Sequence, residues 1–213
     1  MKAHRKMIRR TALVAGTGVV ALVLAACGGN GGNSAHDMGA MGQPTASPSA
    51  TASATAGDHN AADVSFAKDM IQHHRQAVEM AELADTRASS AETKDLATKI
   101  KGAQDPEIKT MSGWLTSWGE EVPADMPSQG HDMSSGMPGM MSMADMDKLK
   151  NSTGAEFDKM FAEMMIKHHE GAIEMAKAEK TGGKYEPAKK LADDVIKAQT
   201  AEIEQMKKML GTS

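Results

Sequence analysis

One motif with the donor groups of a soft metal site occurs twice in this sequence, 95 positions apart. The first copy, residues 66–81, reads FAKDMIQHHRQAVEMA, and the second, residues 161–176, reads FAEMMIKHHEGAIEMA. Histidine with methionine is a ligand set that suits copper, as Cu(I) with Met and His or as Cu(II) with His, and imidazole alone also suits zinc. The sequence therefore predicts a metal site, with copper preferred and zinc as the alternative, built from His73, His74, His168, His169, Met70, Met165, Met80 and Met175.

Helical periodicity places both histidine pairs toward the inside of a fold. At 100° per residue, Phe66, Met70 and Ala77 fall on one apolar stripe, and the two histidines of the first copy lie on either shoulder of it. The second copy repeats this arrangement around Met165 and Ala172. We expect the two motif helices to face each other across a pseudo-twofold axis, so that four His and four Met converge at its centre.

A second helical pattern follows each motif and repeats at the same offset. Residues 96–111 and 191–206 carry apolar residues at spacings of three and four, and no stretch alternates like a strand. Polar breaks at 85–90 and 181–186 divide each unit into two helices, and Pro106 is expected to kink the second of them. The sequence thus predicts an all-α fold, a four-helix bundle of two repeated helical hairpins over residues 62–211.

A methionine-rich linker at about 120–146 separates the two hairpins. Between 126 and 146 the methionines stand among Gly, Ser, Pro and Asp without helical spacing, so we interpret them as loop residues that packing does not explain. Such a loop could collect copper at modest affinity. The weaker candidate ligands are His131, Met133, Met137, Met140, Met141 and Met143.

The N-terminal region has the features of a lipoprotein export signal. A basic start and an apolar run fill residues 1–26, and the run ends at Leu24-Ala25-Ala26-Cys27, which resembles a bacterial lipobox. Cys27, the only cysteine, would carry the lipid, and residues 27–61, rich in Gly, Ser, Thr and Pro, would form a disordered tether. We expect a lipid-anchored protein on the extracytoplasmic face of the cell membrane, exported by the general route or, through Arg9-Arg10, by the twin-arginine route.

The charge balance argues against a nucleic-acid partner. The whole chain has a net charge of -4, from 24 Lys+Arg and 28 Asp+Glu. Removal of residues 1–26 removes five basic residues and no acidic ones, so the net charge becomes 19 − 28 = -9. Nucleic-acid binding favours the opposite sign.

The paired motifs resemble those of the domain-of-unknown-function 305 family. The trailing Gln-x-x-Glu-Ile-x-x-Met at 104–111 and 199–206 matches as well, as does Trp114-Leu115 with Trp118. This resemblance covers about 62–211 and implies a ferritin-like four-helix bundle, in a family of which some members are implicated in copper binding or tolerance. It also implies that the four motif histidines are the signature positions.

Comparison with di-iron bundles favours copper over iron. Those proteins place Glu three residues before the liganding His, whereas Met70 and Met165 occupy these positions here. Glu107 and Glu202 could face inward, but two carboxylates do not complete a di-iron set. Glu79 and Glu174 are expected on the outside of the bundle.

Two classes of function fit these features. The first is copper sequestration, tolerance or transfer, with a copper exporter or oxidase as a partner. The second is a ferritin-like redox enzyme that oxidises Cu(I) or handles reactive oxygen, and a structural or stress-response lipoprotein is a further alternative. No nucleophile–base pair or phosphate-binding loop stands out in the sequence, which favours a binding protein over an enzyme.

Overall fold

The computed structural model describes residues 57–124 and 136–212. Within these ranges the chain forms five helices and no named strand. They are α1 (Ala61–Arg87), α2 (Ala91–Trp118), α3 (Met143–Asn151), α4 (Gly154–Gly182) and α5 (Glu186–Met209). The predicted all-α bundle is confirmed, and the two hairpin turns, at 88–90 and 183–185, lie inside the predicted breaks.

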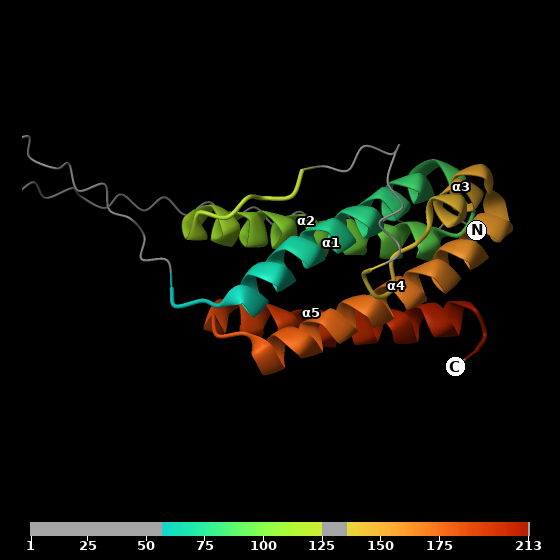
Figure 1. Cartoon of the computed structure of the whole chain (residues 1–213). Coiled ribbons are helices and arrows are strands. Elements are labelled where there is room, and N and C mark those ends of the chain that lie inside the picture. Colours follow the sequence, from blue (N-terminus) through green and yellow to red (C-terminus); the bar gives the residue numbers. More distant parts are fainter. Residues whose placement is uncertain (1–56, 125–135, 213) are drawn as a thin grey trace, which may run out of the picture. The chain divides into compact units, whose positions relative to one another are not determined.

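The four long helices form two hairpins that meet through the motif helices. Helix α1 packs along α2, and α4 packs along α5, while α1 lies against α4 (Figure 1). The outer helices α2 and α5 touch each other only slightly. Helix α2 continues through Pro106 without a break in its assigned helix. The arrangement places both copies of the His motif at the contact between the hairpins.

Each hairpin is fastened to the other by an aspartate near the start of its first helix. In α1, Asp63 Oδ1 accepts hydrogen bonds from the backbone N–H groups of Lys184 (3.0 Å) and Tyr185 (2.9 Å) in the opposite hairpin turn. In α4, Asp158 Oδ2 accepts from the backbone N–H of Ser90 (3.0 Å) and from the Ser89 hydroxyl. These contacts are related by the same offset of 95 as the motif. Because Tyr185 and Ser90 are the N-cap residues of α5 and α2, each hairpin supplies an anionic partner to the start of a helix in the other.

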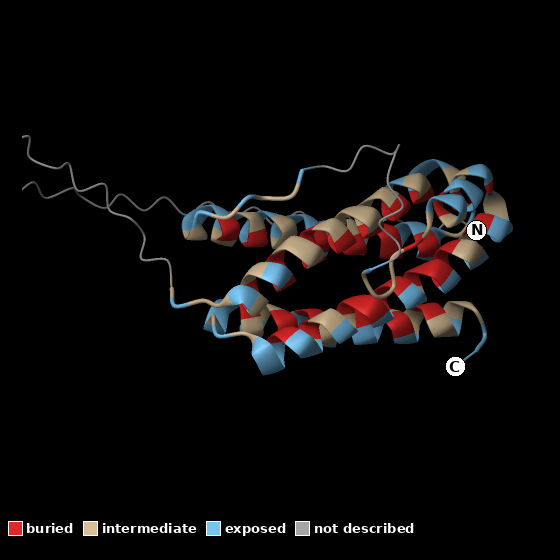
Figure 2. Cartoon of the chain, viewed as in Figure 1, coloured by how far each residue is buried: buried red, intermediate tan, exposed pale blue. Residues whose placement is uncertain are grey.

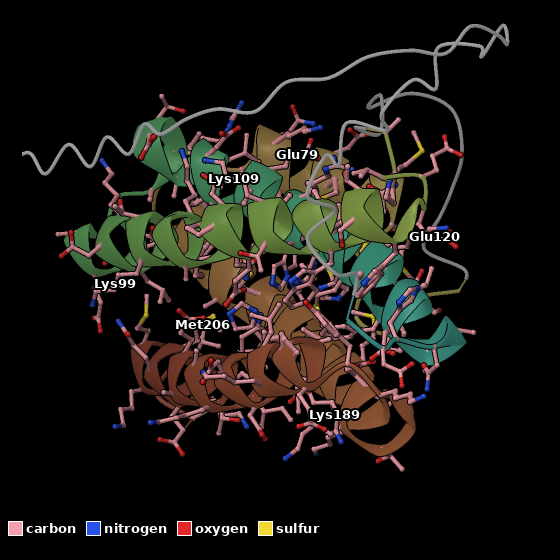
Figure 3. All side chains as sticks on the ribbon, turned by 90° about the vertical axis from the view of Figure 1, so that its left-hand side faces the viewer. Glu79, Lys99, Lys109, Glu120, Lys189 and Met206 are labelled. Atoms are coloured by element: carbon pink, nitrogen blue, oxygen red, sulfur yellow. The ribbon has the colours of Figure 1, made fainter. Side chains whose placement is uncertain are left out.

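The interior contains two apolar clusters at different positions along the bundle. One is built from the second half of α1 and the first half of α4, with Phe157, Phe161 and Leu149 among its fully buried side chains. The other joins the first half of α1 to the second half of α4, and includes Phe66 and Leu115. Buried residues line the facing sides of the helices (Figure 2). Met206 lies between the ribbons of α2 and α5 (Figure 3).

Part of the methionine-rich linker belongs to the folded core, which the sequence interpretation did not foresee. Residues 143–151 form the short helix α3, whose N-cap Ser142 accepts a hydrogen bond from the backbone N–H of Asp145. Met141 and Met146 are buried and pack in the first apolar cluster. The interpretation that packing does not explain these sulfurs is therefore wrong for Met141 and Met146, because the neighbouring Leu149 gives α3 an apolar face to bury.

The predicted export signal, Cys27 and most of the tether lie outside the described residues. The same holds for His131 and Met133 of the linker. Among the helices that are described, none is long and apolar enough to cross a membrane.

Candidate metal site

The four motif histidines form a buried polar layer between the two apolar clusters. His73, His74, His168 and His169 are each fully buried. Along α1 the pair separates Ile71 of one cluster from Ala77 of the other, and α4 repeats this arrangement. The rings of His73 and His168, equivalent in the repeat, are in contact, with centroids 3.7 Å apart and planes inclined by 39°. The four histidines therefore point inward as predicted, and the two copies of the motif meet through His73 and His168.

The outer histidine of each pair is held by a glutamate from the second helix of its own hairpin. His74 Nε2 donates to Glu107 Oε2 at 2.7 Å, and His169 Nε2 donates to Glu202 Oε2 at 2.7 Å. The two glutamates are themselves related by the repeat. Carboxylate acceptors of this kind fix which ring nitrogen carries the proton.

Every motif histidine keeps a ring nitrogen that has no hydrogen-bond partner within the described residues. These atoms are the Nδ1 atoms of His73, His74 and His169, and both ring nitrogens of His168. A buried nitrogen lone pair without a donor is costly unless something else satisfies it. Metal coordination would satisfy these atoms, since neutral imidazole binds metals through such a lone pair.

Burial keeps the central histidines neutral. It lowers the pKa of His73 to about 3, with the nearby His74 and His169 lowering it further and the Pro138 carbonyl opposing them. Burial also lowers the pKa of His168 well below 6.5, assisted by the other three histidines. A neutral ring is the form that a metal ion binds, so these two histidines need not lose a proton at neutral pH before binding one.

The motif methionines surround the histidine layer on both sides. Met70 and Met165 are fully buried, in the second and first clusters respectively, so the two equivalent sulfurs come from opposite ends of the layer. Met80 is fully buried in the first cluster, and Met175 is partly buried against the second. Their apolar surroundings give all four a packing role, in addition to any role as ligands.

A segment of the linker, residues 136–142, lies over His73 and is called the strap below. The carbonyl of Pro138 accepts a hydrogen bond from His73 Nε2 at 3.0 Å. The side-chain amide of Gln76 clamps the strap at Met141, donating to its carbonyl at 2.9 Å and accepting from its N–H at 2.7 Å. The strap thus connects the methionine-rich linker to the histidine layer.

Glycine makes this close approach of the strap possible. A Cβ atom at Gly171 would lie 2.0 Å from the Pro138 carbonyl oxygen, so no larger residue fits this point of α4 without moving the strap. Gly139 has a φ of 77°, the left-handed region that favours glycine. Gly171 is the repeat equivalent of Gln76, so the same motif position has different functions in the two hairpins.

The candidate metal ligands in the linker differ in how far they are buried. Met137 and Met140 are partly buried in or beside the strap, Met141 is buried, and Met143 is 46% exposed. Across residues 57–124 and 136–212, no three His, Cys, Asp or Glu side chains are arranged to hold a metal ion. The described side chains therefore do not form a ready-made tetrahedral zinc site or di-iron site. A site with two imidazoles and thioether sulfur remains compatible with their arrangement.

Comparisons with known proteins place the chain in a family. The family model "Domain of unknown function (DUF305)" matches residues 63–210. The chain belongs to the DUF305 family. A DUF305 protein of known structure from Streptomyces coelicolor is 33% identical, with a TM-score of 0.63 over 70% of this chain and 92% of that chain.

A second similar protein of known structure, CopM, has been solved with bound metal. CopM in its Cu(II)-bound form is 39% identical, with a TM-score of 0.59 over 69% of this chain and 94% of that chain. CopM in its Cu(I)-bound form is 37% identical, with a TM-score of 0.57 over the same shares. CopM has also been solved with silver. A search of the curated proteins finds no match.

Several residues around the DUF305 motif were not identified from the sequence as parts of the site. Gln76, Pro138 and Gly171 position the strap, and Glu107 and Glu202 were noted only as carboxylates that could face inward. The repeat contained a signal for the glutamates, since the two occupy equivalent positions of a matched helical pattern. No sequence signal links the strap to α4, because that contact depends on the path of the linker.

Proposed function

We propose that this protein binds copper and serves in its sequestration, tolerance or transfer outside the cytoplasm. One observation carries the proposal: a fully buried layer of four histidines has unpartnered ring nitrogens and is flanked by thioether sulfur. Imidazole with thioether is a donor set for Cu(I), and imidazole alone serves Cu(II). CopM, a similar protein of known structure solved with Cu(I) and with Cu(II), supports the assignment.

Copper is favoured over iron by the residues that precede the histidines. Met70 and Met165 stand where a di-iron bundle has glutamate, and both are buried in apolar surroundings. A thioether is a poor ligand for the harder iron ions. The ferritin-like redox alternative would therefore require copper chemistry, which aerobic turnover of Cu(I) by the purified protein would reveal.

The linker provides a route between solvent and the histidine layer. Met143, at the start of α3, is exposed, Met140 and Met137 are partly buried, and the strap that carries Met137 and Met140 contacts His73. Thioethers at graded depth would bind Cu(I) weakly before imidazole binds it more tightly. A copper exporter or oxidase is the kind of partner that would receive the ion.

The test of the proposal is a metal titration of the histidine layer. Replacing His73, His74, His168 and His169 with Ala should weaken Cu(I) binding by about a hundredfold or more, because it removes every imidazole of the layer. Affinity is measured by competition with a chromophoric Cu(I) chelator, and then repeated with Cu(II) and Zn(II). A double variant, His73→Gln with His168→Gln, keeps the side chains polar and nearly fills their volume, which guards against loss of folding.

The control is His59→Ala, since His59 stacks on Trp118 away from the layer. This variant should bind Cu(I) as the wild type does. Unchanged affinity in both the quadruple and the double variant would contradict a site in the histidine layer and would leave the linker methionines as the ligands. Tighter binding of Zn(II) than of Cu(I) would contradict the choice of metal.

We also propose that Cys27 anchors the protein in the cell membrane through a lipid. The lipobox-like sequence before it supports this proposal. We expect Cys27→Ala to move the protein from the membrane fraction to the soluble extracytoplasmic or secreted fraction, measured by fractionation and immunoblotting. A Ser34→Ala variant, altered in the tether, should stay with the membrane. Membrane retention of the Cys27 variant would show that the lipid assignment is wrong.

A further inference from the structure

We propose that Glu107 and Glu202 are positioning residues of the copper site. Each carboxylate holds the proton of its histidine on Nε2, so that His74 and His169 present the Nδ1 lone pair to the metal. This proposal rests on the proposed copper function for its metal step. Its statement about the ring protons applies to the metal-free protein and can be tested alone.

The hydrogen bonds have the geometry of a charge-assisted pair. Both Nε2–Oε2 distances are 2.7 Å, which is at the short end for a nitrogen donor and a carboxylate. The carboxylate can only accept, so the shared proton belongs to the imidazole. A neutral ring with its proton on Nε2 has its lone pair on Nδ1, and that atom is the one without a partner in both histidines.

The histidine and the glutamate of each hydrogen-bonded pair differ in burial. The histidine side chains are 0% exposed, whereas the side chains of Glu107 and Glu202 are 21% and 19% exposed. The glutamates therefore remain partly hydrated on the outer side of the layer, and the rings lie between them and the interior. In many metal sites the histidine ligands likewise donate their other ring N–H to a carboxylate, which leaves the lone pair for the metal.

The repeat argues against a chance origin of these two His–Glu hydrogen bonds, because the same bond occurs in both hairpins. Glu107 and Glu202 come from α2 and α5, which scarcely touch, yet each lies 33 positions after the histidine that it binds and makes the same bond. The other glutamates of the motif behave differently. Glu79, labelled in Figure 3, forms an ion pair with Lys150 at 2.9 Å. Glu174 is exposed.

The central histidines lack such a carboxylate. His73 donates to the neutral carbonyl of Pro138, and His168 has no partner on either nitrogen among the described residues. The layer therefore contains two imidazoles whose proton is held by a carboxylate, one, His73, whose proton is held by a neutral carbonyl, and one, His168, with no acceptor that fixes its proton. A carboxylate partner fixes the orientation of the ring as well as the position of its proton, so the pair held by Glu107 and Glu202 is the better prepared to bind a metal ion.

The experiment compares three double variants of the purified protein. Glu107→Leu with Glu202→Leu removes both acceptors, and Glu107→Gln with Glu202→Gln keeps an acceptor oxygen without the charge. Glu92→Leu with Glu204→Leu, on exposed positions of the same two helices, is the matched control. Two-bond ¹H–¹⁵N correlation spectra of the metal-free proteins report the protonated ring nitrogen, and chelator competition reports Cu(I) affinity.

We expect the Nε2–H form for His74 and His169 in the wild type and in the control. The Leu variant should lose this preference and bind Cu(I) about 10- to 100-fold more weakly, the range found for such partners, and the Gln variant should recover part of both. A merely structural role would not move the tautomer signals of a variant that folds normally, as judged by its unfolding transition.

Three results would overturn the inference. They are an Nδ1–H form for both histidines in the wild type, wild-type Cu(I) affinity in the Leu variant, and carboxylate oxygen bound to copper in X-ray absorption spectra. Failure of the wild type to bind copper would instead refute the proposed function, and the tautomer spectra would still decide which nitrogen carries the proton.

Discussion

Replacing Asp63 with Ala should lower the free energy of unfolding by about 3 kcal/mol, since several buried donors lose their acceptor at once. Asp63 is fully buried. Its carboxylate accepts from the N–H groups of Asn60, Lys184 and Tyr185, which belong to the N-cap of α1 and to the turn before α5. The variant would thus weaken one helix start and one contact between the hairpins together. Urea unfolding followed by circular dichroism measures the change.

Asp69→Ala is the matched control for this loss. It lies two turns further along the same helix, removes the same charge, and breaks only an exposed hydrogen bond from Ser65. We expect it to change stability by less than about 0.5 kcal/mol. A loss of less than about 1 kcal/mol in Asp63→Ala would show that the turn finds other acceptors for its N–H groups.

Glu179 should make the protein less stable as the pH rises from 6.5 to 8. Glu179 is 2% exposed, and burial, followed by the neighbouring carboxylate of Asp63, raises its pKa from 4.5 to about 8. Between these values the folded state holds a proton that the unfolded chain has released, so the stabilisation present below pH 4.5 is lost as the pH rises through 8. The last 1.5 pH units of this window correspond to about 2 kcal/mol.

The buried histidines make the protein less stable on the acidic side of the same pH profile. The pKa of His73 is lowered to about 3 and that of His168 well below 6.5. Both rings therefore stay neutral in the fold while the unfolded chain gains protons, and stability falls as the pH drops below 6.5. The lowered pKa of Asp63 adds a loss in the same direction below about 3.8. Stability should accordingly be greatest near pH 6.5.

Glu179→Gln tests whether Glu179 causes the loss of stability on the alkaline side of this pH profile. The amide mimics the protonated acid, so the variant should lose the decline between pH 6.5 and 8 and keep the one below 6.5. Glu174→Gln, an exposed position on the same helix, should follow the wild type. An unchanged alkaline decline in Glu179→Gln would assign it to another group. Urea unfolding at half-unit pH steps gives the comparison.

The features that repeat in the sequence were the ones that could be predicted. Two copies of the motif gave the helices, their hairpins and the inward direction of His73 and His168, because periodicity and duplication encode these directly. Features that occur once were missed. The strap on His73 and the burial of Met141 depend on the path of a linker that has no regular pattern.

Contacts between residues that are far apart in the sequence are the other features that could not be predicted. Asp63 reads in the sequence as one of many acidic residues in a first helical turn, yet its partners are more than 120 positions away. Glu179 likewise stands among lysines at a helix end, and only the fold places it beside Asp63 under the turn at Gly183. Propensity and capping rules describe neighbours along the chain, so they cannot locate such pairs.

The reciprocal aspartates have a consequence for how such a chain could have arisen. A single hairpin would carry an aspartate with no turn to bind and a turn whose N–H groups lack an acceptor. Two copies, however, would satisfy each other, since Asp63 and Asp158 each serve the hairpin to which they do not belong. The present domain is thus equivalent to a twofold homodimer whose subunits have been joined by the linker. Within one chain the two copies of the motif can differ, and they carry Gln76 and Gly171 at the equivalent position, both of which the strap contacts; a dimer of identical subunits could not encode this asymmetry.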